Sequence, residues 1–295
     1  MAGYTVSTGD ESDRAEMISD PKLRAMASYL PSSMIRSMGM AYRDSFLSEL
    51  AVCLQQQRTT LDEIGRYLVE NQTKIERAVD FVKHRVNSED EERIRYIVTS
   101  AFVASYLNGL PPAILLAICE QESGFSFPAE SSGVGPWQLT AASAVGELNH
   151  PDTAYRERKI EDMRNRITRM GGPEFIGIVN GPVMRIGQSG AIYASRSEMS
   201  SHYQYRALES GDMAAKTLLA KGEVNRNMIT SDRVLRDLFI KYNGSDNKLA
   251  YGNSVLSLYH LYERAVERPT NEQVMNSVPV PVETWTQQRR KGPEI

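Results

Sequence analysis

The sequence predicts a mainly α-helical protein with one small β-hairpin. Two observations predict the helices: apolar residues recur at three- and four-residue intervals along most of the chain, and capping residues precede several of these segments. A third observation predicts the hairpin, because Asn180-Gly181 lies between two runs that contain β-branched residues. The hydrophobic fraction of 41% is ordinary for a globular chain of 295 residues and is enough for a core.

Residues 1–87 are predicted to form a helical region that serves assembly or docking. Helices are expected from Asp20 onwards, with an interruption at Pro31. The clearest helix begins after Thr60, which has capping-box spacing with Glu63. This helix carries an apolar stripe: Leu61, Ile64, Leu68, Ile75, Val79 and Val82. The stripe indicates packing against neighbouring helices, and a surface for a partner protein is the alternative.

A second domain is predicted over residues 88–266. Ser88 and Glu91 repeat the capping-box spacing, and the helix that follows them is expected to end at Asn108-Gly109. A short apolar helix is expected to begin near Pro112. The remaining elements are helices near Leu139, over 153–170, over 210–221, after Ser231 and around 251–261, with the hairpin within 174–187.

Composition and charge argue against several classes of function. The net charge of −3 does not favour a nucleic-acid partner. The two cysteines and four histidines show no metal-ligand spacing, so neither a metal nor another cofactor is predicted. No membrane span is predicted, and the polar N-terminus lacks the apolar segment of a secretory signal. The Pro-rich tail, residues 267–295, is predicted to be an extended docking segment.

The segment most indicative of chemistry is 111–144, where two carboxylates lie near the end of the apolar helix. Glu120 and Glu122 are about 200° apart around a helix, so they cannot share a face. Glu122 follows Leu115 by seven residues and Ile118 by four, which places it on the apolar side. Burial there is expected to raise its pKa, and a protonated carboxyl can donate a proton to a leaving oxygen. A hydrogen-bonded Glu at a helix end is the structural alternative.

Four segments in this order resemble the soluble lytic transglycosylase pattern. The segments are Glu122-Ser123-Gly124-Phe125, Gly133-Val134-Gly135-Pro136-Trp137-Gln138, Tyr242-Asn243-Gly244 and Tyr251. They are similar to glycoside hydrolase family 23, the goose-type lysozyme and soluble lytic transglycosylase group. The resemblance covers roughly residues 90–265 and implies a mainly α, lysozyme-like (α+β) fold with a cleft between two lobes. The stretch between Thr140 and Tyr242 is longer than in compact members of that family.

The resemblance also implies roles for individual residues. Glu122 would protonate the glycosidic oxygen between N-acetylmuramic acid and N-acetylglucosamine, then act as base on the muramic acid 6-hydroxyl. The residues implied to bind substrate are Ser123, Gln138, Tyr242, Asn243 and Tyr251. Tyr242 is further expected to hydrogen-bond Glu122.

Structural alternatives remain open for several of these residues. Ser123 can bond a carbonyl at the helix end, and Asn243 can simply terminate its helix. Tyr251 can fill the core, and Trp137 can either stack on a sugar ring or pack in the core.

The predicted function is therefore that of a lytic transglycosylase whose partner is the peptidoglycan glycan strand. Because no secretory signal is recognised, we expect a bacteriophage virion component that opens the wall locally during infection, bound to virion proteins through the N-terminal helices or the tail. A phage lysis enzyme and an enzyme attached to a secretion apparatus are alternative routes. The alternative activities are a hydrolytic muramidase of the same fold and a structural protein with an inactive lysozyme-like domain.

Overall fold

The mainly α-helical class is confirmed in the computed structural model. The model describes residues 18, 20–56, 59–127, 133–139, 185–186, 192–193, 203–222, 229, 231–243 and 248–267. Strands β1 (Arg185–Ile186) and β2 (Ile192–Tyr193) pair antiparallel. Most of the expected 174–187 hairpin, the helix expected over 153–170 and nearly all of the 267–295 tail lie outside the described residues. No helix in the described ranges has the length and apolar character to cross a membrane.

The N-terminal helices follow the predicted breaks. They are α2 (Pro21–Ala27), α3 (Ser32–Ser37), α4 (Gly39–Gln56) and α5 (Leu61–Val86). Thr60 and Glu63 form the complete capping box at the start of α5, each side chain accepting the other residue's backbone N–H. The apolar stripe of α5 is buried from Ile64 to Val82, so the stripe packs inside the molecule.

The later helices are α6 (Glu91–Asn108), α7 (Pro112–Ser123), α11 (Ala207–Gly222), α12 (Asp232–Tyr242) and α13 (Lys248–Glu267). The predicted cap of α6 was wrong. Asp90, not Ser88, precedes the first helical residue, and its carboxylate accepts the N–H of Arg93 at 3.0 Å. Ser88 lies two residues too early to cap α6, and its hydroxyl accepts the N–H of Asp90 instead.

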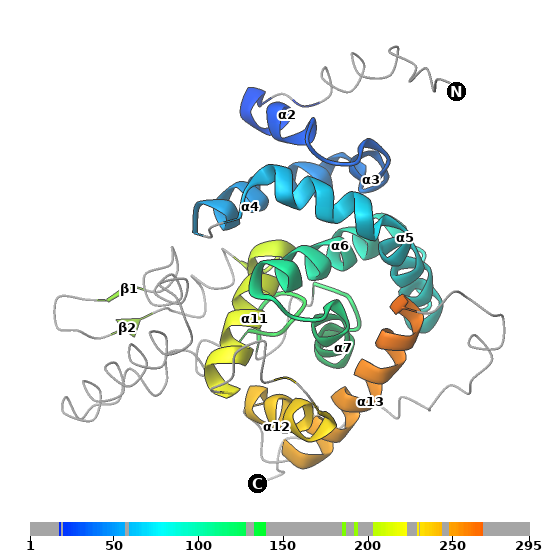
Figure 1. The fold of residues 1–295 in the computed structure, drawn as a ribbon, viewed down its shortest axis with the longest axis vertical. Helices are drawn as coiled ribbons and strands as arrows, with labels where there is room; N and C mark the ends of the chain where they lie inside the picture. The colour runs from blue at the N-terminus through cyan, green and yellow to red at the C-terminus, as the bar shows by residue number, and fades with distance from the viewer. Residues whose placement is uncertain are drawn as a thin grey trace, which may run out of the picture.

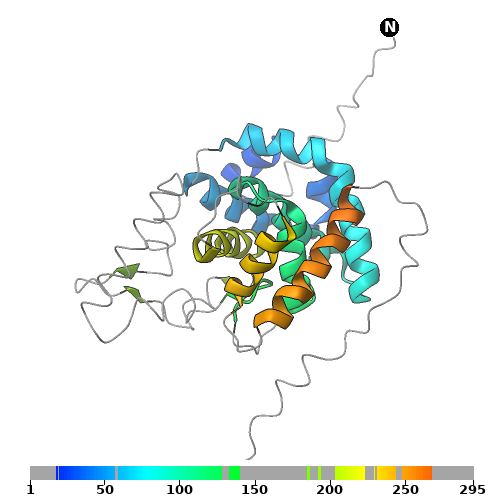
Figure 2. The ribbon, with the colours of Figure 1, turned by 60° about the horizontal axis from the view of Figure 1, so that its bottom comes forward.

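Helix α7 lies at the centre of the molecule, with α6, α11, α12 and α13 arranged around it (Figure 1). Its residues from Ala113 to Cys119 are all buried, which an apolar helix requires when neighbours cover every side. A second view shows α12 and α13 side by side, with α13 also lying against α5 (Figure 2). One hydrophobic core joins α3, α4 and α5 to the later helices. The division into domains at residue 87 stays a prediction.

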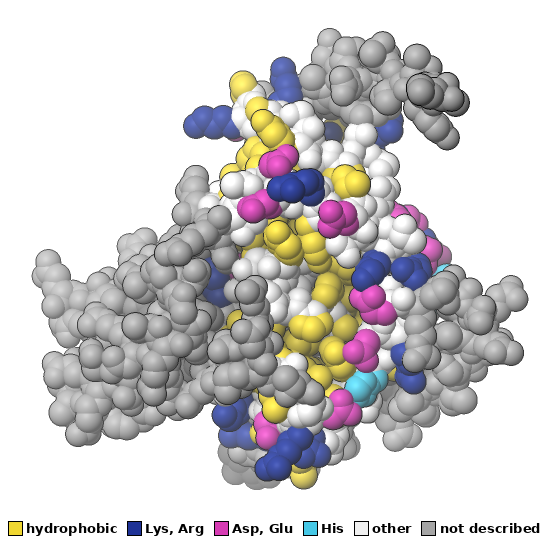
Figure 3. Space-filling view, in the orientation of Figure 1, with side chains coloured by type: hydrophobic (Ala, Val, Ile, Leu, Met, Phe, Trp, Pro, Cys, Tyr) yellow, Lys and Arg dark blue, Asp and Glu magenta, His cyan; other side chains and the backbone are white. Residues whose placement is uncertain are grey.

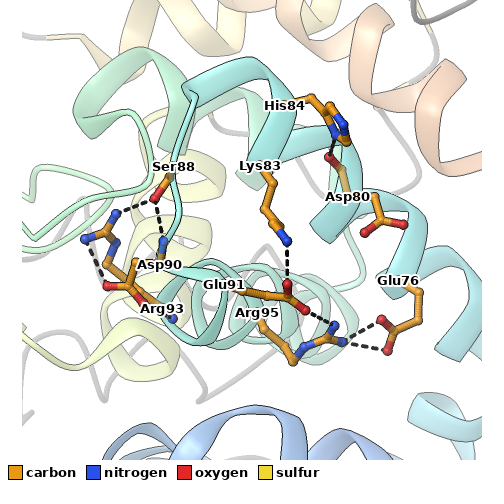
Figure 4. Close-up of polar contacts among 9 residues, drawn as sticks. All are labelled: Glu76, Asp80, Lys83, His84, Ser88, Asp90, Glu91, Arg93 and Arg95. Carbon is orange, nitrogen blue, oxygen red and sulfur yellow. Dashed lines mark hydrogen bonds and ion pairs between the residues drawn. The ribbon is translucent and has the colours of Figure 1, made fainter.

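Charged side chains of both signs are interspersed on the described surface, and hydrophobic side chains gather over its middle (Figure 3). At the junction of α5 and α6 these charges pair with each other (Figure 4). Glu91 contacts both Lys83 and Arg95, and Arg95 also contacts Glu76 at 2.6 Å. The partly exposed Lys83–Glu91 pair contributes up to about 1 kcal/mol, whereas Arg95 is buried and its two carboxylate partners also offset the desolvation of its charge.

The N-terminus of α11 is buried and is capped by side chains from other helices. Glu49 of α4 is completely buried, and its carboxyl accepts the backbone N–H of Glu209 at 2.9 Å. The Tyr96 hydroxyl donates to Glu49 and accepts the N–H of Ala207 at 2.9 Å. These bonds satisfy backbone N–H groups in the first turn of α11 that lack partners within the helix.

Because Glu49 is buried, we predict that stability falls as the pH rises from about 4.5 to about 8. Burial raises the pKa of Glu49 to about 8, so the folded chain keeps a proton that the unfolded chain releases above its ordinary pKa near 4.5. The contribution of Glu49 to stability is therefore fully present below pH 4.5 and declines by up to about 1.4 kcal/mol per pH unit through this window. Thermal unfolding at pH 5, 6.5 and 8 should show a smaller decline for Glu49→Gln than for the wild type.

Glu89→Gln is the control for this prediction, since it removes one carboxylate from an exposed position. It should keep the wild-type pH dependence. Equal pH dependence in the wild type and Glu49→Gln would show that Glu49 does not carry the extra proton.

Candidate functional site

Glu122 lies in the last turn of α7, where the buried face of the helix emerges. The helix ends at Ser123, and Gly124 adopts the left-handed conformation with φ of 59°. Leu115 and Ile118, which the sequence places on the same side as Glu122, are completely buried. Glu122 itself is partly buried. The carboxyl group is therefore held at the margin of the core.

The hydroxyl of Tyr251 hydrogen-bonds the carboxyl of Glu122, with 2.6 Å between the hydroxyl oxygen and Oε1. Tyr251 lies in the first turn of α13. The expected bond from Tyr242 to Glu122 was wrong, because the single hydroxyl proton of Tyr242 goes to the carbonyl of Trp137 at 2.9 Å. Tyr251, which was expected to contact sugar or to fill the core, is thus the tyrosine that bonds the Glu122 carboxyl group.

Tyr242 nevertheless lies within electrostatic reach of Glu122. Burial raises the pKa of Tyr242 well above its ordinary value, and the nearby charge of Glu122 raises it further. Tyr242 therefore stays protonated and keeps its bond to the Trp137 carbonyl. This bond joins α12 to the 133–139 turn, and the Tyr251 bond joins α13 to Glu122 of α7.

Gln138 lies at the end of a tight turn, which its own side chain stabilises. Val134 and Leu139 exchange two backbone hydrogen bonds of 2.9 Å across the turn. The Gln138 amide donates to the carbonyl of Gly135 at 2.9 Å, and the residue is only 7% exposed. A Cβ at Gly133 would lie 2.5 Å from the Gln138 backbone, so glycine is required there.

Trp137, in the same turn, is a core residue. Its indole is fully buried and donates to the carbonyl of Leu115 in α7 at 2.9 Å. The core alternative is therefore the correct interpretation, and stacking on a sugar is excluded for this ring.

The other two predicted substrate-binding residues have local structural roles. The hydroxyl of Ser123 donates to the Cys119 carbonyl at 3.1 Å and accepts the N–H of Ser126 at 3.4 Å. Asn243 terminates α12, and its N–H bonds the carbonyl of Phe239 at 3.2 Å. Both observations agree with the structural alternatives, and a contact with substrate stays a prediction for each residue.

Glu120 has partners that the sequence did not predict. Its carboxylate forms a two-pronged ion pair with Arg85 of α5, with distances of 2.6 and 3.0 Å. The hydroxyl of Tyr262 in α13 also bonds this carboxylate. Arg85 and Tyr262 belong to no recognised motif, and the only sequence signal was a basic side chain near the end of a helix.

The chemistry available at Glu122 is that of a partly buried carboxyl group that accepts a hydrogen bond from the Tyr251 hydroxyl. Where the chain is described, no group of three or more His, Cys, Asp or Glu residues is placed to hold a metal ion. A scan against protein-family models matches no family, and searches of curated proteins and of solved structures find no similar protein. The site is therefore interpreted from its own geometry and from the order of its motifs.

Proposed function

We propose that this protein is a peptidoglycan lytic transglycosylase with Glu122 as its acid and base. The observation that carries this proposal is the partly buried carboxyl of Glu122 at the end of α7, oriented by the Tyr251 hydroxyl. The order of the Glu-Ser, Gln and Tyr-Asn segments supports it, as does Tyr242, which bonds the Trp137 carbonyl beside Gln138 and feels the charge of Glu122. A general acid needs a fixed carboxyl that is sheltered from bulk water.

In the proposed reaction one carboxyl group acts twice. Protonated Glu122 donates its proton to the oxygen that links N-acetylmuramic acid to N-acetylglucosamine, and that bond breaks. The resulting carboxylate then takes the proton of the muramic acid 6-hydroxyl, whose oxygen bonds to C1 and closes the 1,6-anhydro ring. The proton count balances and no water is consumed. Most glycosidases need a second carboxyl group, whereas here the nucleophile belongs to the substrate.

The proposed setting is the bacterial cell wall during phage infection, with the protein carried as a virion component. Proteins of the virion, or of a secretion apparatus, are the proposed partners. The regions proposed to contact them are the N-terminal helices and the 267–295 tail.

The test is digestion of purified peptidoglycan followed by mass spectrometry of the soluble products. Transglycosylase activity yields muropeptides with 1,6-anhydro ends. Reducing ends would contradict the transglycosylase chemistry and support the hydrolytic muramidase. Absence of soluble products would contradict both activities and support a structural protein.

For Tyr251→Phe we predict a kcat that is about 10- to 100-fold lower. The substitution removes a hydrogen bond to a carboxyl group, which contributes about 1.5–3 kcal/mol, and tenfold in rate corresponds to about 1.4 kcal/mol. Product release from peptidoglycan measures the rate. Tyr259→Phe is the matched control, because it removes a hydroxyl bonded to Glu263 on the same helix. Equal rates for the two variants would contradict a role for Tyr251 in orienting Glu122.

A further inference from the structure

The last turn of α7 is held by an ion pair from the N-terminal part of the chain. Arg85, in the last turn of α5, contacts both carboxylate oxygens of Glu120. The Arg85 and Glu120 side chains are 22% and 11% exposed, so water screens the pair only in part. Two parallel N–H···O bonds fix direction as well as distance. The pair therefore constrains the orientation of this turn relative to α5.

Helix α13 holds the same turn at three successive residues. The hydroxyl of Tyr262 bonds Glu120, and the hydroxyl of Ser254 donates to Gln121 at 2.5 Å. Glu122 is bonded by Tyr251, as described above. Burial and the charge of Glu120 raise the pKa of Tyr262 well above its ordinary value, so this hydroxyl remains a donor. These three bonds from α13 are made by neutral hydroxyl groups. Arg85 supplies the positive charge that balances the Glu120 carboxylate.

We propose that Arg85 is a positioning residue for Glu122. The ion pair with Glu120 holds the turn that carries Glu122 and neutralises the carboxylate two residues before it. This inference rests on the proposed role of Glu122 as the acid. It also makes α5 part of the catalytic unit, because the N-terminal helices then determine the geometry of the site.

The charges of Arg85 and Glu120 should act on the ionisation of Glu122 in opposite directions. Burial raises the pKa of the Cys119 thiol, and the charges of Glu120 and Glu122 both raise it further, so both carboxylates act on one neighbouring group. An unpaired Glu120 would disfavour a second negative charge at Glu122, whereas an unpaired Arg85 would favour it. Among the described residues, the titratable groups that interact with Glu122 include Tyr251 of α13, Tyr242 of α12 and Cys119 of its own helix.

The experiment measures kcat, KM and the pH–rate profile for variants of the pair. Arg85→Met should lower kcat about tenfold or more with KM within about twofold, because the bound substrate meets a misplaced acid. The alkaline limb of the pH–rate profile of Arg85→Met should move to higher pH by about one unit, because the unpaired Glu120 carboxylate disfavours ionisation of Glu122. Glu120→Gln should move this limb to lower pH, and the double variant should return it to the wild-type position. A loss of packing alone would not produce opposite shifts.

Glu76→Gln is the matched control, since it breaks the ion pair of α5 with Arg95 of α6 without touching α7. It should leave kcat and the pH profile unchanged. If Arg85→Met does not fold, the inference is tested by whether the alkaline limb of the Glu120→Gln profile moves to lower pH. Unmoved profiles in an active enzyme, or equal changes in Glu76→Gln, would overturn the inference alone. A wild type that releases no muropeptides would instead overturn the proposed function, and this inference with it.

Discussion

Glu122→Gln is expected to lower the release of muropeptides at least about 100-fold, and up to about 10⁴-fold, while the protein stays folded. The amide has nearly the shape of the carboxyl group, and its oxygen can still accept the bond from Tyr251. It can neither give a proton to the glycosidic oxygen nor take one from the 6-hydroxyl. Both proposed steps therefore fail together, and no second carboxyl group replaces them in this mechanism.

A zymogram and the mass-spectrometric assay should be run on Glu122→Gln beside Glu263→Gln. Glu263 lies on α13 with its side chain 48% exposed, so its substitution removes a carboxylate that the proposed reaction does not use. The midpoints of thermal unfolding of both variants should lie close to the midpoint of the wild type. Clearing by Glu122→Gln at the wild-type rate would show that another group is the acid.

Much of the helical fold could be predicted from local sequence signals. Breaks and caps at Pro31, Thr60, Gly109 and Ser231 each lie at an observed helix boundary, because capping depends on a few neighbouring side chains. The start of α6 was misplaced, because Ser88 has capping-box spacing with Glu91 whereas Asp90, the actual cap, has Arg93 at the third position. Local signals therefore predict that helices exist better than they predict where helices start.

The contacts of the predicted site residues could not be derived from the sequence. The period of α7 did not single out a face for Glu122, because all seven residues from Ala113 to Cys119 are buried. It could not decide which tyrosine bonds Glu122, because Tyr242 and Tyr251 reach it from different helices whose packing is not encoded locally. Arg85 was missed for the same reason, since its partner Glu120 lies beyond the helix that carries it. Tertiary contacts between helices decide these pairings.

Trp137→Ala is expected to lower the free energy of unfolding by about 3–5 kcal/mol and the midpoint of thermal unfolding by roughly 6–20 °C. The indole fills a fully buried position between α7 and α11: its N–H bonds the Leu115 carbonyl, and a Cβ at Gly211 would lie 3.1 Å from the ring. Alanine leaves a cavity there. Thermal and urea unfolding measure the loss, and Trp137→Phe should lose less because it keeps most of the ring volume.

The two substitutions separate the chemistry of the site from the core that supports it. Trp137→Ala should weaken both stability and activity. Loss of the ring should displace the turn whose carbonyl at residue 137 anchors Tyr242 and whose next residue is Gln138. Glu122→Gln should weaken activity alone. A tryptophan that stacked on sugar would show the reverse pattern, with a higher KM and an unchanged unfolding midpoint. An unfolding midpoint for Trp137→Ala within about 2 °C of the wild type would therefore contradict the core position of this ring, since it corresponds to at most about 1 kcal/mol.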